Sequence, residues 1–273
     1  MTLRRRGVPG LLAAVLLAPG LAACGTATTT DSGPGPGALA DPKQALLAAT
    51  EAIGDGNFTF TMTGGELTAD GSMHAPSRSA RITMKSAGDP AAEISVAIDV
   101  IYVEPETWVR TDLSGLDELR AGLTELGGAP TPNPNTGKYQ HLDRSRLKGI
   151  EDLEIDFQDI DPAGSAILAE AVTGVQKVDG GFAGTIDLAR ATGAGLTDEE
   201  VVRTLGTGAT VPFTAEVDQE NRLTELALQI PAAGGSEARE LKVTYGYDEA
   251  APAQAPPASE VVEATDDMYE MFE

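Results

Sequence analysis

Apolar and polar side chains alternate at every second position along several segments of the chain. This period of two is typical of β-strands with one covered and one exposed face. In the first half, short connections without helices join these segments, which predicts an antiparallel meander. The strands expected there are 58–63, 66–74, 79–86, 93–100, 102–103 with 107–111, and 138–143.

Several other segments have the spacing of helices. Residues 41–53 predict an amphipathic helix, because Asp41 is a good N-cap and Pro42 fits the first helical turn. For a later helix, Asp161 is expected as the N-cap, with Pro162 at the first helical position. The later helices are expected at 114–126, 146–153, 161–172 and 197–203, and three prolines predict a surface loop at 127–137.

The second half of the chain returns to strands. It predicts two hairpins and a last strand, at 175–178 with 182–188, at 211–217 with 223–230, and at 241–247. Because Pro212 has no backbone N–H to donate, its strand should lie at a sheet edge or begin after it. These elements together predict an α+β fold, in which helices cover one face of an antiparallel sheet.

The N-terminal segment ends in the only cysteine of the chain. Three arginines precede an apolar run at 11–17, and small residues stand directly before Cys24. A basic region, a short apolar region and small residues before the cut are typical of a secretory signal peptide. With cysteine next, the segment resembles the lipobox of bacterial lipoproteins. That resemblance implies a covalent diacylglyceryl group on Cys24, and we expect no other cofactor.

Two other interpretations of this segment stay open, an ordinary signal peptide cut nearby and an uncleaved transmembrane anchor. A bilayer span takes about 20 apolar residues. The run from Gly7 to Ala23 is shorter and contains Pro9 and Pro19, so it would span poorly. We therefore expect a protein held by two acyl chains on the extracytoplasmic face of the cell membrane.

Acidic residues dominate the charge of the chain. The formal net charge is −23, and loss of the three arginines with residues 1–23 makes it −26. Such a surface repels nucleic acid, which we exclude as a partner. It also repels anionic lipid headgroups, so the lipid anchor rather than charge would hold the protein on the membrane.

Four parts are expected along the chain. Residues 1–23 are the signal peptide, 24–40 a flexible tether, 41–248 one folded domain, and 249–273 an Ala/Pro-rich linker with an acidic tail. The tail is expected to be disordered. The alternative is a short amphipathic segment that docks on a partner or on its own domain, with helical spacing of Val261, Thr265, Met268 and Phe272.

The order of these elements resembles the LppX/LprAFG lipoproteins of actinobacteria, which have the LolA/LolB-like fold. The resemblance covers roughly 41–247 and is carried by 107–110, 138–143, 184–188 and 211–218. In that family a curved antiparallel half-barrel wraps a few helices, and a hydrophobic cavity between them holds acyl chains. It implies a protein that binds, carries or presents a lipid or glycolipid outside the cytoplasmic membrane. The low aromatic content and the acidity of this chain depart from the family pattern.

The chain shows no catalytic pattern. Its two histidines, His74 and His141, lie in separate segments, and no hydrolase, metalloprotease or nucleotide-binding spacing occurs, so we expect neither an enzyme nor a metal site. An ordinary core gives the same alternation as a ligand-binding face. The alternative is therefore a ligand-free interaction or sensor lipoprotein with an envelope protein partner. The candidate ligand-binding residues on the apolar sheet face are Phe58, Phe60, Met62, Ile94, Val96, Ile98 and Trp108.

Overall fold

The computed structural model describes residues 41–270, except 66, 87–94, 115–136, 144, 147–154, 156, 158–159, 192, 195–202, 204, 207, 234–236 and 249. The expected signal peptide, Cys24, the tether and Ile94 lie outside the described residues. So do nearly all residues of the helices predicted at 114–126, 146–153 and 197–203, and of the loop predicted at 127–137.

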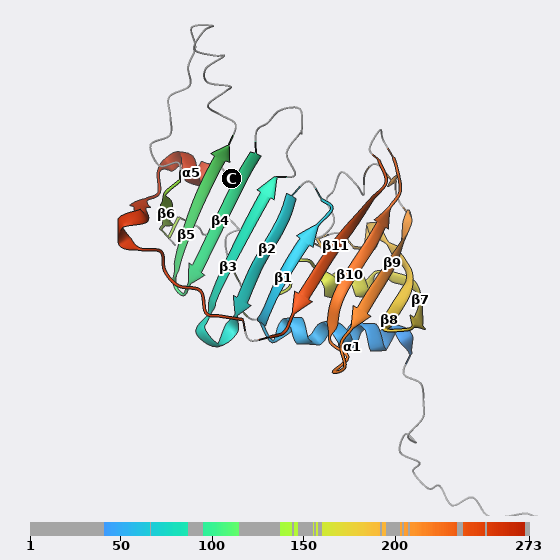
Figure 1. Cartoon of the computed structure of the whole chain (residues 1–273). Coiled ribbons are helices and arrows are strands. Elements are labelled where there is room, and N and C mark those ends of the chain that lie inside the picture. The colour runs from blue at the N-terminus through green and yellow to red at the C-terminus, as the bar shows by residue number, and fades with distance from the viewer. Residues whose placement is uncertain are drawn as a thin grey trace, which may run out of the picture. The chain divides into compact units, whose positions relative to one another are not determined.

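In the described part of the chain, twelve strands form one open sheet in the order β12-β6-β5-β4-β3-β2-β1-β11-β10-β9-β8-β7 (Figure 1). Every neighbouring pair is antiparallel except β12 with β6, so the predicted antiparallel sheet and its meander are confirmed. The strands are β1 (Asn57–Thr63), β2 (Leu67–His74), β3 (Ser79–Ser86), β4 (Ser95–Val103), β5 (Glu106–Ser114), β6 (Tyr139–Leu142), β7 (Val172–Val178), β8 (Gly181–Asp187), β9 (Thr210–Val217), β10 (Leu223–Ile230), β11 (Arg239–Gly246) and β12 (Val261–Glu263).

The hairpins predicted in the second half are confirmed as β7 with β8 and β9 with β10, and the last predicted strand is β11. Both alternatives predicted for Pro212 are wrong, because β9 lies between β8 and β10 and begins at Thr210, before the proline. Pro212 is paired with Thr185 of β8, whereas the pairs with β10 end at Phe213. The proline therefore lies just beyond the ladder on its β10 side, where no donor is needed.

The predicted first helix is confirmed as α1 (Pro42–Gly54), with the side chain of Asp41 accepting a hydrogen bond from the backbone N–H of Lys43. The helix predicted at 161–172 is shorter, because α3 (Ser165–Glu170) begins at a left-handed Gly164. Asp161 is thus not the N-cap residue and Pro162 is not the first helical residue, although Oδ2 of Asp161 still accepts from the N–H of Ala166 at 2.8 Å. Among the described residues, the remaining helices are α5 (Asp266–Glu270) and the 3-10 turns η1 (Ala75–Ser77), η3 (Leu188–Arg190) and η4 (Ala258–Glu260).

The helices define an inner face of the sheet, and we call the opposite side the outer face. Figure 1 shows α1 crossing behind β11, β10 and β9, where its apolar side chains join the main core. The largest side chains of the main core include Leu46, Ile53, Phe58, Phe213, Leu228 and Leu241. A separate small core lies on the inner face of β4, β5 and β6, and consists of Val100, Val109, Leu142, Met268 and Tyr269.

The C-terminal segment docks on its own domain, so the expectation of a disordered acidic end is wrong for the described residues up to 270. Residues 261–263 pair with β6 as a parallel strand. Met268 and Tyr269 of α5 are each 5% exposed. Of the residues at helical spacing, Met268 makes this intramolecular contact, whereas Val261 lies in β12 and Thr265 is exposed. No helix among the described residues combines the length and the hydropathy that a membrane crossing requires.

Candidate functional site

The structure brings five of the predicted apolar residues to the inner face but gives them different surroundings. Phe58 and Phe60 are 0% and 3% exposed and belong to the main core. Met62, Val96 and Ile98 are only partly buried. The alternation therefore found the correct face of β1 and β4, but the two phenylalanines are core residues, as the alternative interpretation allowed.

Trp108 lies on the other face of the sheet, which corrects its grouping with the apolar residues. In β5 the inward side chains include the buried Thr107 and Val109. Trp108 instead faces outward with its register partners Ile101 and His141, and its ring centroid is 5.8 Å from that of His141. Hydrophobicity suggested an inward position, but the parity of the strand decides which way a side chain points.

A row of half-buried apolar side chains crosses the inner face. Met62, Ala69, Met84 and Ile98 are consecutive register partners on β1, β2, β3 and β4. None of the four is fully buried. The first two pack against the main core and the last two against the small core. We call this row, with the half-buried Ile82 and Val96 beside it, the apolar strip.

A polar atom lies at the end of the apolar strip. Thr111 on β5 is the register partner of Ile98, and its hydroxyl is buried without a hydrogen-bond partner in the described part of the chain. A buried hydroxyl with no partner costs about 1–3 kcal/mol. Within the described residues, the strip thus combines apolar surface with one unsatisfied polar group, the combination that an amphiphilic ligand would satisfy.

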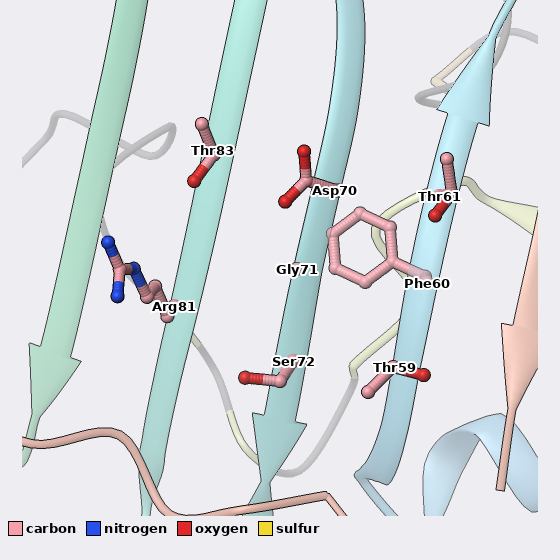
Figure 2. Close-up of a pocket in the computed structure, with 8 residues that line it drawn as sticks. All are labelled: Thr59, Phe60, Thr61, Asp70, Gly71, Ser72, Arg81 and Thr83. Atoms are coloured by element: carbon pink, nitrogen blue, oxygen red, sulfur yellow. The ribbon is translucent and has the colours of Figure 1, made fainter.

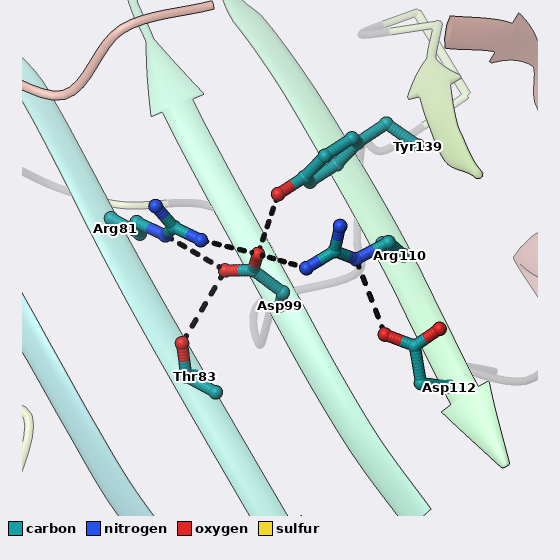
Figure 3. A network of polar contacts seen from close by, with 6 residues as sticks. All are labelled: Arg81, Thr83, Asp99, Arg110, Asp112 and Tyr139. Atoms are coloured by element: carbon teal, nitrogen blue, oxygen red, sulfur yellow. Dashed lines mark hydrogen bonds and ion pairs between the residues drawn. The ribbon is translucent and has the colours of Figure 1, made fainter. Parts of the chain in front are cut away.

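The outer face carries a different arrangement, centred on Asp99 of β4 (Figure 3). Its carboxylate accepts hydrogen bonds from Arg81 Nε and Nη2 at 3.1 and 2.8 Å, and from Arg110 Nη2 at 3.1 Å. Tyr139 donates its hydroxyl at 2.6 Å, and its ring lies 4.6 Å below the guanidinium carbon of Arg110. Asp112 forms an ion pair with Arg110 Nε at 3.2 Å.

These contacts set the charge state of Asp99. Burial alone would raise its pKa, but the hydrogen bonds from Arg81 and Tyr139 and the charges of both arginines outweigh that effect and lower it. The carboxylate therefore stays ionised at neutral pH. Burial, followed by the hydrogen bond to Asp99, raises the pKa of Tyr139 to about 12. The network is an ion cluster that ties β3, β4, β5 and β6 together, in which the buried Nε of Arg110 has an ion pair with Asp112 but no hydrogen-bond partner in the described part of the chain.

Beside this network the outer face has a depression of about 470 Å³ over β1, β2 and β3 (Figure 2). It lies behind the apolar strip, on the opposite side of the sheet, so an acyl chain on the strip would not enter it. Its lining suits a polar ligand better than an acyl chain. The lining residues are Thr59, Phe60, Thr61, Asp70, Gly71, Ser72, Arg81 and Thr83.

Sequence reasoning missed the Asp99 network and Thr111. One signal was available, since Asp99 and Arg110 carry opposite charges at positions of the same parity on consecutive strands. Among the described residues, no three His, Cys, Asp or Glu side chains gather as ligands for a metal ion. Comparisons of the chain with protein-family models, with curated proteins and with solved structures gave no match.

Proposed function

We propose that this protein binds an amphiphilic lipid or glycolipid on the inner face of its sheet, and carries or presents it outside the cytoplasmic membrane. The observation that carries the proposal is the apolar strip, which leaves aliphatic side chains half-buried between two packed cores. Each methylene transferred from water to such a surface contributes about 0.8 kcal/mol. An acyl chain along the strip would therefore bind without any catalytic group.

Two further features support this proposal. The hydroxyl of Thr111, at the end of the strip, offers a donor to an ester or headgroup oxygen. The antiparallel sheet with helices on one face is also compatible with a curved half-barrel of the LolA-like type, the fold of the lipoproteins that the order of elements resembles. In this proposal the strip takes the acyl chains and Thr111 takes a polar group next to them.

The proposed location rests on Cys24. A diacylglyceryl group on this residue would anchor the protein to the extracytoplasmic face of the membrane. Cys24→Ala should release the protein from the membrane fraction and leave its lipid binding unchanged. Retention of this variant on the membrane would refute the lipid anchor, but the proposal that the protein binds a lipid would be unaffected.

Ligand binding is tested by titrating the protein with the fluorescent fatty acid cis-parinaric acid. Ile98→Gln places a polar side chain in the strip, and Ala97→Gln places the same side chain on the adjacent, outward position of β4. Loss of about 1.4 kcal/mol of apolar burial corresponds to about tenfold weaker binding. We expect this loss for Ile98→Gln, and an affinity within twofold of the unmodified protein for Ala97→Gln.

Two outcomes would contradict the proposal. Absence of saturable binding of the probe to the unmodified protein would refute the proposal that the protein binds a lipid. Equal effects of the two glutamine variants would place binding elsewhere than on the strip. Circular dichroism and urea unfolding of both variants establish that neither has lost its fold.

A further inference from the structure

The C-terminal segment 258–270 covers part of the same inner face that carries the apolar strip. Met268 and Tyr269 lie over Val100, Val109 and Leu142 of β4, β5 and β6. Those three residues are 6%, 0% and 1% exposed with the segment in place. Without it they would form an apolar surface next to the strip, because Met84 and Ile98 pack against the same cluster.

Polar contacts hold this segment at its rim. Besides an exposed ion pair, they include hydrogen bonds from the backbone N–H of Ala264 to the carbonyl of His141 and from that of Thr265 to Oε1 of Gln140. The hydroxyl of Tyr269 accepts from the backbone N–H of Asp143 at 2.7 Å, and the guanidinium of Arg146 lies 3.7 Å from the ring centroid. Arg146 also pairs with Asp266, whose side chain is 81% exposed. Exposed ion pairs of this kind contribute at most about 1 kcal/mol each.

The strand contact of the segment is short. β12 consists of three residues and, among the described strands, pairs with β6 alone, at the end of the sheet order. Its carboxylate Glu263, 85% exposed, lies 3.5 Å from Nδ1 of His141. Residues 250–257, which precede the segment 258–270, are Ala, Pro and Gln and form no helix or strand. The segment can therefore leave without breaking any pair of the meander.

We propose that residues 258–270 are a displaceable cover over a second acyl-binding surface, formed by the inner faces of β4, β5 and β6. When the cover leaves, an acyl chain on the apolar strip extends onto Val100, Val109 and Leu142. The ligand then replaces the side chains of Met268 and Tyr269, which are themselves a flexible thioether chain and an apolar ring. This inference rests on the proposed function and identifies where the bound chain ends.

A reversible cross-link tests the cover in one protein. Gln140 and Val262 are register partners on β6 and β12. Neighbouring strands are about 4.8 Å apart, within the Cα separation that a disulfide bridges. The full-length variant carries Gln140→Cys and Val262→Cys, with Cys24→Ser to prevent wrong pairing. Oxidation locks the cover, and reduction frees it.

We expect the reduced form to bind cis-parinaric acid about tenfold more tightly than the oxidised form, because only the reduced form can uncover the second surface and bury more of the acyl chain. Equal affinity in both forms would overturn the cover while leaving the strip as the binding site. If neither form binds the probe and the unmodified protein does not bind it either, both the proposed function and the proposed cover are refuted. If the unmodified protein binds the probe but the cysteine variant does not, two point variants of Tyr269 decide whether the segment is a cover.

Those variants are Tyr269→Ala, which removes the ring, and its matched control Tyr269→Phe, which keeps the ring and loses only the hydroxyl. We expect Tyr269→Ala to bind the probe about tenfold more tightly and Tyr269→Phe to stay within about twofold of the unmodified protein. Weaker or unchanged binding by Tyr269→Ala would show that Tyr269 is part of the site or irrelevant to it, and would overturn the cover.

Discussion

Replacement of Asp99 by alanine should destabilise the sheet more than any other change to a charged side chain on its outer face. The side chain of Asp99 is 6% exposed, and its carboxylate receives hydrogen bonds from two arginines and a tyrosine. Breaking a buried ion pair by removing one partner costs about 3–5 kcal/mol. Here the side chains of Arg81 and Arg110 remain 52% and 28% exposed and can be hydrated after the change. We therefore expect a loss of about 2–3 kcal/mol in the free energy of unfolding.

The measurement is urea unfolding at pH 7, with Asp112→Ala as the matched control. Asp112 pairs with the same Arg110, but its side chain is 51% exposed. An exposed pair contributes at most about 1 kcal/mol. The midpoint should fall for Asp99→Ala with an unchanged slope, and should hardly move for Asp112→Ala. Similar costs for both variants would refute the burial argument.

The pH dependence of the free energy of unfolding tests the same role of Asp99 in a second way. Because the pKa of Asp99 is lower in the folded protein, its stabilising effect is present above the unfolded value of about 3.9. That effect is lost as the pH falls through the folded pKa. The difference between the unmodified protein and Asp99→Ala should therefore shrink in acid. A constant difference down to low pH would contradict the charge argument.

Two further predictions concern His141 and Thr111. Burial lowers the pKa of His141, but hydrogen bonds and charges from Glu106 and Glu263 outweigh burial and raise it, so protonation stabilises the fold below about pH 6.5 and this effect is lost as the pH rises through the folded pKa. Thermal unfolding measured across this pH range should show that His141→Gln has lost this pH dependence. An unaltered pH profile of the variant would contradict the prediction. Thr111→Val should raise the free energy of unfolding by about 1 kcal/mol, because it removes an unsatisfied hydroxyl. The same variant should bind a lipid with an ester headgroup more weakly, and unchanged binding would mean that this hydroxyl does not contact the ligand.

The alternation of side chains predicted most of the sheet because it reports a local property. It located β3 at its observed ends, Ser79–Ser86, and both hairpins of the second half. It could not tell that β1 pairs with β11, which joins residues near 60 to residues near 245, because no local pattern records such a contact. Trp108 shows the related limit, since its size suggested the core while strand parity placed it outside.

The site was less predictable than the fold. Asp99 lies between Arg81 and Arg110 only after three strands pair in the observed register, and a slip of one residue would separate them. The docking of α5 depends on Met268 and Tyr269 meeting a surface more than a hundred residues away in the sequence. Both features arise from tertiary pairing, which composition and spacing do not encode.

The central claim is that the inner face of the sheet holds an amphiphilic lipid. Its most direct test is mass spectrometry of the full-length protein, purified under native conditions from the membrane of its own organism, followed by organic extraction. We predict a non-covalently bound, acyl-chain-containing species that is recovered reproducibly with the unmodified protein and is depleted from Ile98→Gln but not from Ala97→Gln. Recovery of the protein alone, or equal recovery of lipid from both variants, would contradict the claim.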